Sequence, residues 1–563
     1  MKDITKPMIT RRRFVKGVAA SAALLSTGFL TRLSYANESE STGAKRKVFN
    51  LEIAPKRVNF TGVPSTATVV NDQLPGPIIK FQEGDDITIR VTNKLDEMTT
   101  IHWHGIILDA EMDGVPGISF PGIAPGETFV HTFKAVQHGT YWYHAHTLHE
   151  QTGVYGALII EPKDKTLEPI VDRDYPVILS DWTDEDPLDV FMNLKKMGGY
   201  YNYQQLTLAD FIDDVSILGI SEAVAKRRVW NKTRMSPTDF SDVSAATYTY
   251  LMNGHSPQSN WTGIAKAGEK LRLRFICAAT ASYFDVRIPG IKLTVISTDG
   301  QAVIPVTVDE FRIGPGETYD VIIEIPDESA YTIFAQSMDR SGYACGTLAA
   351  RQGIKANIPA LDPPIQLDLI DMMGAMATSN NMQMGMMKSA KKPNHARTEY
   401  GPGVDMRVDY PRTNLDDPGP GLRNNGRKVL TYADLKSLHP PEDNRQPSRE
   451  IELHLTGNME RFIWSIDGLK LNEAKPLHFP LGERIRVIFH NDSTMTHPMH
   501  LHGMWSDLEA PDGSFQVRKH TISVQPAQSV SMLVTVDAQG RWAFHCHLLY
   551  HMAAGMFREV VVA

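Results

Sequence analysis

Cysteine is almost missing from this chain, because its 563 residues contain only Cys277, Cys345 and Cys546. At most one disulfide can therefore form within it. Long apolar runs are also missing after residue 36, so we expect a protein without a stable membrane anchor. An excess of positive charge is missing too, and the formal net charge is −8. This acidic balance argues against nucleic acid as a partner and is compatible with cationic substrates.

The first 36 residues predict an export signal. A twin-arginine pattern occupies residues 10–16 (TRRRFVK), and a weakly apolar run then leads to a cleavage pattern at residues 34–36 (SYA). The alternative, a membrane anchor, is disfavoured because the run is short and contains Ser, Thr and Gly. Twin-arginine machinery exports folded proteins, so we expect a bacterial protein of the periplasm. Removal of residues 1–36 takes away seven basic residues and one acidic residue, which makes the mature chain more acidic.

Cys277 and Cys345 flank one apparent domain. In an oxidising compartment they can form a disulfide. Two separate buried thiols are the alternative, because a sequence does not reveal the distance between two α-carbons. The disulfide is favoured slightly, and both readings stay open at this point.

Short strands and turns dominate the pattern, which predicts an all-β protein. Residues 86–93, 269–275 and 483–491 alternate apolar and polar side chains with period two, and each run closely follows a glycine. These echoes indicate three diverged copies of one β-sandwich module. We place the domains at residues 47–162, 175–359 and 363–563. The third contains an irregular, methionine-rich insertion at 371–449, and residues 215–228 have helical character.

The densest chemical signal surrounds Cys546, which lies between His545 and His547 and is followed by His551 and Met556. A thiolate, imidazoles and a distant thioether are the ligands of a blue-copper electron-transfer centre. In an extended segment, neighbouring side chains point to opposite faces. Cys546 is therefore expected to face one metal while its two neighbours face another.

The His-x-His spacing recurs three more times, so the histidines are unlike isolated core residues. Ten of the 20 histidines fall in the four clusters, whereas a lone buried Cys or His is usually structural. On a strand, each pair projects both imidazoles from one face, and one element can then serve two adjacent metals. The three further clusters are His102-Trp103-His104, His144-Ala145-His146 and His497-Pro498-Met499-His500-Leu501-His502.

These four clusters resemble the ligand motifs of multicopper oxidases over essentially the whole mature chain. Residues 452–459 and 517–521 look specifically like the periplasmic copper-resistance protein A branch. The resemblance implies three cupredoxin-like Greek-key β-sandwich domains and four copper ions, with a trinuclear cluster between the first and third domains. It assigns type 1 copper to His497, Cys546, His551 and Met556, type 2 copper to His102 and His500, and the type 3 pair to His104, His144, His547, His146, His502 and His545.

The resemblance also implies a role for Asp113, which matches an acidic residue near the type 2 copper of related oxidases. A turn aspartate before Gly114 is the alternative. The sequence departs from some relatives at Met552, where they carry a proton-donating glutamate.

Seven methionines fall within sixteen residues of the insertion, and soft thioethers select Cu(I). Met495 precedes His497 by two residues, as a substrate methionine does in cuprous oxidases of the family. Asp371 is a candidate carboxylate for stabilising Cu(II), although Ser493 and Thr494 replace a second acid. An apolar helical stripe is the alternative reading of the methionines. The candidate substrate residues are Asp371, Met372, Met373, Met376, Met382, Met384, Met386, Met387 and Met495.

The predicted function is oxidation of Cu(I) to Cu(II) coupled to reduction of dioxygen to water, in copper resistance. Laccase-like oxidation of phenols is the alternative within the enzyme class. A copper-sequestering protein that stores metal in the methionine-rich insertion is the alternative outside it.

Overall fold

The computed structural model describes residues 45–233, 235–375 and 392–563. The expected export signal and five of the candidate methionines, Met376, Met382, Met384, Met386 and Met387, lie outside these ranges. Strands make up 40% of the structure and helices 12%, which confirms the all-β prediction. Among the residues described, none of the helices combines the length and apolar character that a membrane crossing requires.

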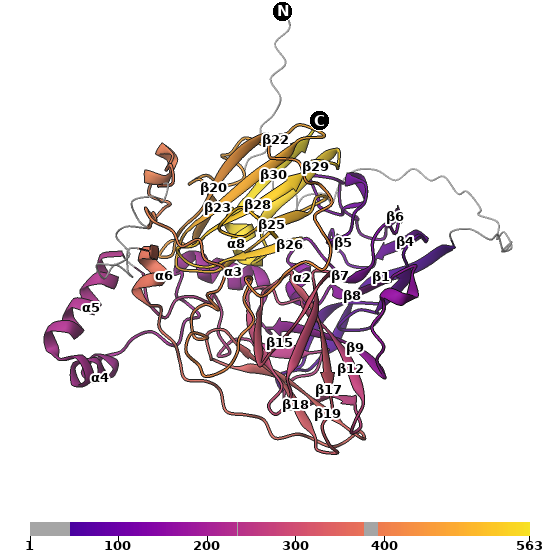
Figure 1. Ribbon diagram of the computed structural model, residues 1–563, viewed down its shortest axis with the longest axis horizontal. Helices are drawn as coiled ribbons and strands as arrows, with labels where there is room; N and C mark the ends of the chain where they lie inside the picture. Colours follow the sequence, from indigo (N-terminus) through magenta and orange to yellow (C-terminus); the bar gives the residue numbers. More distant parts are fainter. Residues whose placement is uncertain (1–44, 234, 376–391) are drawn as a thin grey trace, which may run out of the picture.

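Six sheets form three pairs along the chain (Figure 1). The first pair has the strand orders β2-β1-β4-β6 and β3-β8-β7-β5. Its strands are β1 (Arg46–Val58), β2 (Ser65–Val70), β3 (Ile79–Gln82), β4 (Asp86–Asn93), β5 (His102–His104), β6 (Thr128–Lys134), β7 (Gly139–His144) and β8 (Tyr155–Glu161).

The second pair has the orders β10-β9-β12-β17-β14-β15 and β11-β19-β18-β13-β16. Its strands are β9 (Arg173–Trp182), β10 (Thr249–Met252), β11 (Trp261–Ile264), β12 (Lys270–Cys277), β13 (Phe284–Arg287), β14 (Leu293–Thr298), β15 (Gln301–Val308), β16 (Glu310–Ile313), β17 (Thr318–Glu324), β18 (Tyr331–Ser337) and β19 (Tyr343–Ala349).

The third pair has the orders β21-β20-β23-β28-β25-β26 and β22-β30-β29-β24-β27. Its strands are β20 (Arg449–Asn458), β21 (Ile463–Ile466), β22 (Leu477–Phe479), β23 (Arg484–Asp492), β24 (His497–Leu501), β25 (Ser506–Glu509), β26 (Phe515–Lys519), β27 (Thr521–Val524), β28 (Ser529–Thr535), β29 (Gly540–Cys546) and β30 (Phe557–Val562).

The three period-two segments predicted from the sequence become β4, β12 and β23, and they occupy equivalent places. Each pairs in parallel with the opening strand of its unit, β1, β9 or β20. Each also pairs antiparallel on its other side, with β6, β17 or β28. The same neighbours in all three units confirm a repeated sandwich module.

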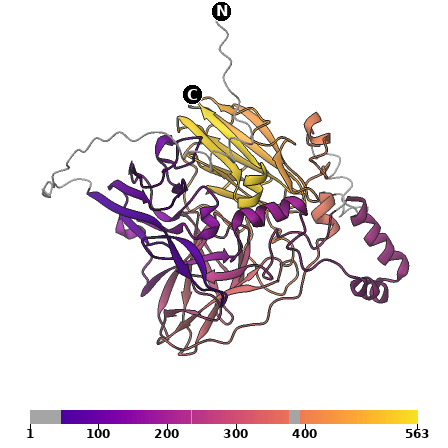
Figure 2. The same cartoon turned by 180° about the vertical axis from the view of Figure 1, so that it is seen from behind.

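Helices decorate the sandwiches. The predicted helical stretch lies in α4 (Leu208–Leu218) and α5 (Ile220–Thr233), which stand out from the sheets in both views (Figures 1 and 2). The other helices of the described residues are η1 (Ala110–Met112), α2 (His149–Thr152), η2 (Lys165–Leu167), α3 (Pro187–Lys196), α6 (Leu369–Met373), η4 (Arg397–Tyr400) and α8 (Leu549–Ala554).

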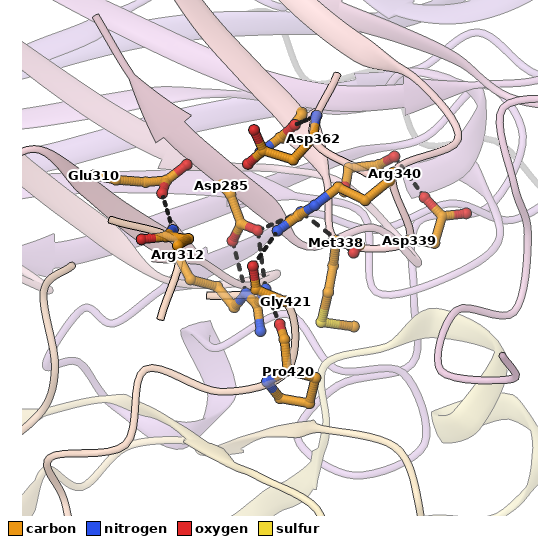
Figure 3. A network of polar contacts seen from close by, with 12 residues as sticks. Asp285, Glu310, Arg312, Met338, Asp339, Arg340, Asp362, Pro420 and Gly421 are labelled. Atoms are coloured by element: carbon orange, nitrogen blue, oxygen red, sulfur yellow. Dashed lines mark hydrogen bonds and ion pairs between the residues drawn. The ribbon is translucent and has the colours of Figure 1, made fainter. Parts of the chain in front are cut away.

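The described part of the irregular insertion is tied to the second sandwich by a buried polar network (Figure 3). Arg312 and Arg340 both donate to the fully buried carboxylate of Asp285. The same guanidinium groups donate to the carbonyl oxygens of Pro420, at 2.9 Å, and Gly421, at 3.2 Å. Burial without a partner is costly for such groups, so this network fixes the course of a segment that has few strands of its own.

The predicted disulfide between Cys277 and Cys345 is wrong, because both thiols are free and buried. Cys277 ends β12 and belongs to the sandwich core. On β19, by contrast, Ala344 and Leu348 face that core. Side chains alternate along a strand, so Cys345 points to the opposite side of its sheet and away from Cys277.

Candidate metal centre

The first sandwich supplies four of the predicted ligand histidines from two paired strands. Strand β5 contains His102 and His104, and β7 ends at His144. The strands are antiparallel with His102 directly opposite His144. His146 follows two residues beyond the end of β7, so the four imidazoles come from one edge of one sheet.

The third sandwich supplies a second set in the same way. Strands β24 and β29 are antiparallel, with His500 opposite His545 and Met499 opposite Cys546. His502 and His547 follow directly after these strands end. Both pairs of strands therefore present histidines at the same relative position, as the repeat of the module requires.

The two sets meet in a buried cluster. His545 Nε2 lies 3.1 Å from His146 Nε2 and 3.0 Å from His502 Nε2. The rings of His104 and His500, from different sandwiches, are stacked with centroids 3.9 Å apart. Ligand atoms lie within 4.8 Å of one another in the sets His102/His500/His502, His104/His144/His547, His146/His502/His545 and His104/His500/His520.

A separate compact group contains the thiol. Cys546 Sγ lies 3.5 Å from His497 Nδ1 and 3.8 Å from His551 Nδ1, and the two nitrogens are 3.1 Å apart. Met556 is fully buried, and its carbonyl accepts the Cys546 N–H at 3.1 Å. Two imidazoles, a thiol and an adjacent methionine are the donor types of a blue-copper site.

Hydrogen bonds to backbone carbonyls fix the orientation of several imidazoles. The Nδ1 atoms of His102, His500 and His545 lie 2.8, 2.6 and 2.9 Å from the carbonyl oxygens of Asp113, His520 and Cys546. A proton on Nδ1 leaves the lone pair on Nε2, which is the arrangement of many metal-binding histidines. Among the described residues, Nε2 of His102, His144 and His500 is buried and has no hydrogen-bond partner.

Burial keeps seven histidines of the cluster neutral. It lowers the pKa of His545 to about 4. Burial, reinforced by neighbouring imidazoles, lowers the pKa values of His104, His144, His146, His500, His502 and His547 well below the usual value. Neutral imidazoles with unpartnered nitrogens are metal ligands ready for use.

Asp113 lies inside this cluster and is 1% exposed. Its Oδ2 is 2.9 Å from His502 Nδ1, and its Oδ1 is 3.3 Å from His102 Nδ1. Since His102 and His502 come from different sandwiches, the carboxylate orients imidazoles on both sides of their boundary. An aspartate that served only the turn before Gly114 would not need these contacts.

Sequence reasoning missed several groups that contact the two clusters. Glu150 Oε2 lies 3.1 Å from His144 Nδ1, and Asp242 Oδ2 lies 3.0 Å from His551 Nε2. Trp464 stacks on His551 with centroids 3.8 Å apart, and His520 joins His104 and His500. Asp242, Trp464 and His520 are distant in sequence from the histidines that they contact, although His520 belongs to the run 517–521 that resembles the copper-resistance branch. Glu150 lies only six residues after His144 but is outside the His-x-His spacing.

The structure gives the candidate substrate residues different environments. Met495 and Met372 are buried, whereas Met373 is 37% exposed. Asp371 is fully buried, and both of its oxygens accept from the Arg423 guanidinium at 2.7 and 3.0 Å. Its carboxylate is therefore paired with an arginine, and its role beside copper stays a prediction.

Comparison with known proteins identifies the family. Models described as multicopper oxidase match residues 52–165, 173–353 and 444–563. The chain belongs to the multicopper oxidase family. It is 50% identical to the copper resistance protein A homolog of Pseudomonas syringae pv. tomato, over 98% of this chain and 99% of that protein. The identity and both coverages are the same for copper resistance protein A of Escherichia coli.

Solved multicopper oxidases share the fold. The laccase from Botrytis aclada superposes with a TM-score of 0.62 at 21% identity, over 92% of this chain and 88% of that one. The multicopper oxidase from Campylobacter jejuni, described as a metallo-oxidase, gives 0.58 at 20% identity over 93% of each chain. The protein is accordingly an oxidoreductase with copper cofactors, and the buried, neutral imidazoles and the thiol described above fit that metal.

Proposed function

We propose that this multicopper oxidase couples the oxidation of Cu(I) to Cu(II) with the four-electron reduction of dioxygen to water. The observation that carries the proposal is the tripeptide His545-Cys546-His547, whose thiol joins one donor group while its imidazoles join the other. We divide four coppers into one type 1 site (His497, Cys546, His551, Met556), one type 2 site (His102, His500) and a type 3 pair (His104, His144, His547 and His146, His502, His545).

Bound copper would supply reversible one-electron exchange at the thiolate site and an acceptor of several electrons at the histidine cluster. The chain supplies the connection between them. Cys546 is bonded through its own backbone to His545 on one side and His547 on the other. This short covalent path supports transfer of electrons from the type 1 site to the cluster, and burial keeps water away from it.

The cluster end needs protons as well as electrons. Asp113 is the described carboxylate that touches both His102 and His502, so its oxygens can hold a proton beside the cluster. Glu150, beside His144, is a second buried carboxyl, and burial raises its pKa well above the usual value. We propose Asp113 as the residue that positions the cluster and exchanges protons there.

Cu(I) is the substrate class favoured by the thioethers near the type 1 group. Buried Met495 lies two residues before His497 along the chain, and soft sulfur donors select Cu(I) over harder ions. Met372 and Met373, with the five methionines outside the described residues, complete the proposed substrate set. Asp371 stays in the proposed set as the candidate carboxylate for Cu(II), and Cu(II) there would compete with the Arg423 guanidinium for its oxygens.

The relatives and the leader support a cellular role and a location. Relatives named for copper resistance are 50% identical over nearly the whole chain. We propose that residues 1–36 direct twin-arginine export to the periplasm, where the mature protein, with sandwiches at 47–162, 175–359 and 363–563, removes Cu(I). Laccase-like phenol oxidation is the alternative that the laccase relatives support.

Oxygen consumption by the copper-loaded protein tests the proposal, with Cu(I) and a phenol compared under the same conditions. We expect Cu(I) to be oxidised with the higher kcat/KM, and a higher value for the phenol would contradict the proposal. Met495→Leu, which keeps the volume but removes the sulfur, should raise KM for Cu(I) and leave phenol oxidation intact. His500→Ala should abolish turnover with both substrates, and retained turnover would refute the cluster assignment.

A further inference from the structure

A second group of histidines and carboxylates lies in the third sandwich, outside both clusters described above. His454 lies on β20, and Asp492 ends β23, the parallel neighbour of β20. His395 precedes η4, and Glu399 lies within it. All four side chains are buried, with at most 3% of each exposed. The group thus joins the irregular insertion to two core strands.

Four donor atoms of this group form a closed ring in which nitrogen and oxygen alternate. Glu399 Oε2 lies 2.7 Å from His395 Nδ1 and 3.3 Å from His454 Nδ1. Asp492 Oδ2 lies 2.6 Å from His454 Nδ1 and 3.7 Å from His395 Nδ1. Metal–ligand bonds of about 2.0–2.1 Å place neighbouring donors roughly 2.9–3.4 Å apart. The four separations extend from 2.6 to 3.7 Å, so they pass that interval by about 0.3 Å at either end.

Backbone groups hold the two carboxylates in this orientation. Glu399 Oε1 accepts the Ala396 N–H at 2.8 Å, and Asp492 Oδ1 accepts the Val408 N–H at 2.6 Å. Each carboxylate therefore has one oxygen fixed by the chain and the other directed at the imidazoles. Fixing of ligand groups by outer hydrogen bonds is typical of metal sites in proteins.

The charge of the group is not balanced by basic residues. Among the described residues, the ion pairs of Glu399 and Asp492 involve His395 and His454 and no lysine or arginine. Two buried carboxylates are costly to keep charged without a positive partner. Burial lowers the pKa of His454, but the hydrogen bond and charge of Asp492 outweigh burial and leave this pKa raised, so a proton on His454 is one such partner. A divalent cation that replaces this proton balances both carboxylates.

We propose that His395, Glu399, His454 and Asp492 form an additional metal site that binds Cu(II). Imidazole and carboxylate donors without any sulfur suit Cu(II) rather than Cu(I), and Cu(II) forms the most stable complexes among the divalent first-row ions. The site goes beyond the four coppers of the oxidase, and its binding does not depend on which substrate the oxidase uses.

The position of the site relates it to the thiol-containing group. Ser493 directly follows Asp492, and its Oγ lies 2.7 Å from His497 Nε2. If Cu(I) is the substrate, as proposed above, its electron would pass to the type 1 copper that His497 would hold. Asp492 of the additional site directly precedes the residue that contacts this histidine, so the site would receive product Cu(II) near the electron-accepting centre. A role of the additional site in receiving product Cu(II) rests on the proposed Cu(I) oxidation, whereas the binding of Cu(II) to the site does not.

Cu(II) titration of the copper-loaded protein tests the site, with equilibrium dialysis for stoichiometry and electron paramagnetic resonance for the ligands. We expect one further Cu(II) per chain with hyperfine structure from two imidazole nitrogens. Glu399→Gln, which keeps the shape of the side chain, should weaken this binding by at least about 10-fold. His478→Gln is the matched control, because His478 is an exposed histidine on β22 of the same sandwich, and it should leave binding unchanged.

Two outcomes would overturn the site: no further Cu(II) bound by the unaltered protein, or equal binding by Glu399→Gln. Retained thiolate–copper absorbance shows that the variant is folded, and His395→Asn, in a loop, serves as a second variant. If neither variant folds, anomalous diffraction from Cu(II)-soaked crystals of the unaltered protein decides, and no copper among the four donors contradicts the site. If the unaltered protein binds the further Cu(II) but does not oxidise Cu(I), the proposed function is refuted and the additional site is not.

Discussion

Asp113 connects histidines of two sandwiches, so a substitution of this single residue tests the assignment of the histidine cluster. Asp113→Asn replaces one carboxylate oxygen by an N–H donor facing His102 Nδ1 or His502 Nδ1, which lie 3.3 and 2.9 Å from the present oxygens. We expect oxygen consumption to fall by about 10–100-fold while the thiolate–copper absorbance is retained. Asp109→Asn changes an exposed carboxylate four residues away, and an equal loss in that variant would contradict the assignment.

A second prediction at the residue scale concerns the alkylation of the three cysteines. Burial raises the pKa of the Cys277 thiol well above its ordinary value and that of Cys345 to about 11. At pH 8 both are protonated and covered, so iodoacetamide should not modify them in the native protein. After unfolding without a reductant and with copper chelated, mass spectrometry should find three adducts per chain. A single adduct would instead support the disulfide that the structure excludes.

Residues that belong to repeated spacings could be predicted from the spacing itself, whereas Asp113 was predicted only through the family resemblance and other solitary residues were missed. His-x-His pairs draw attention because strand geometry puts both imidazoles on one face, and the structure brings them together. Asp242 reaches His551 from the second sandwich, and no local pattern marks it. The pairing of Asp371 with Arg423 was missed for the same reason, because Arg423 lies 52 residues away.

At the scale of elements, the turn after η1 places Asp113, and two glycines allow a matched test. Gly114 has a φ of +88°, and a Cβ there would lie 1.9 Å from the Ile101 carbonyl oxygen. Gly126 has a φ of +75° with open space around the same position. Gly126→Ala should therefore cost only the left-handed strain of about 1–2 kcal/mol.

Gly114→Ala adds a backbone collision to that strain, so its free energy of unfolding should fall further than that of Gly126→Ala. The shift also moves Asp113 and should lower oxygen consumption, which Gly126→Ala should leave unchanged. Chemical unfolding monitored by fluorescence, together with oxygen uptake, compares the two variants. Equal effects on both measurements would show that the turn does not position the carboxylate.

Strands were predictable elements because alternation of apolar and polar residues is a local signal, and β4, β12 and β23 appear where that alternation occurs. The described part of the insertion was predictable only as irregular chain. Its course depends on distant polar contacts, such as those of Arg312 and Arg340 with Pro420 and Gly421. Its His395 and Glu399 gain their partners on β20 and β23 only after folding.

At the scale of the whole molecule, the histidine cluster joins the first sandwich to the third. His146 and His545 face each other across 399 residues of sequence, and the first and third sandwiches each contribute four of the predicted ligand imidazoles to the cluster. Metal bound between them is a crosslink that exists only in the folded state. Ligands of this kind stabilise a protein by about 2.7 kcal/mol per site at 100 times their Kd.

Removal of copper should consequently lower Tm, and re-addition should restore it. Hydrogen exchange then locates the effect: amides of β5, β7, β24 and β29 should lose protection most, because these strands carry the cluster. Strands β14 and β15, which lie at one edge of the second sandwich and contribute none of these histidines, serve as the internal control. Uniform loss over all three sandwiches would mean that copper stabilises the molecule without acting at the boundary between the first and third, and would contradict this prediction.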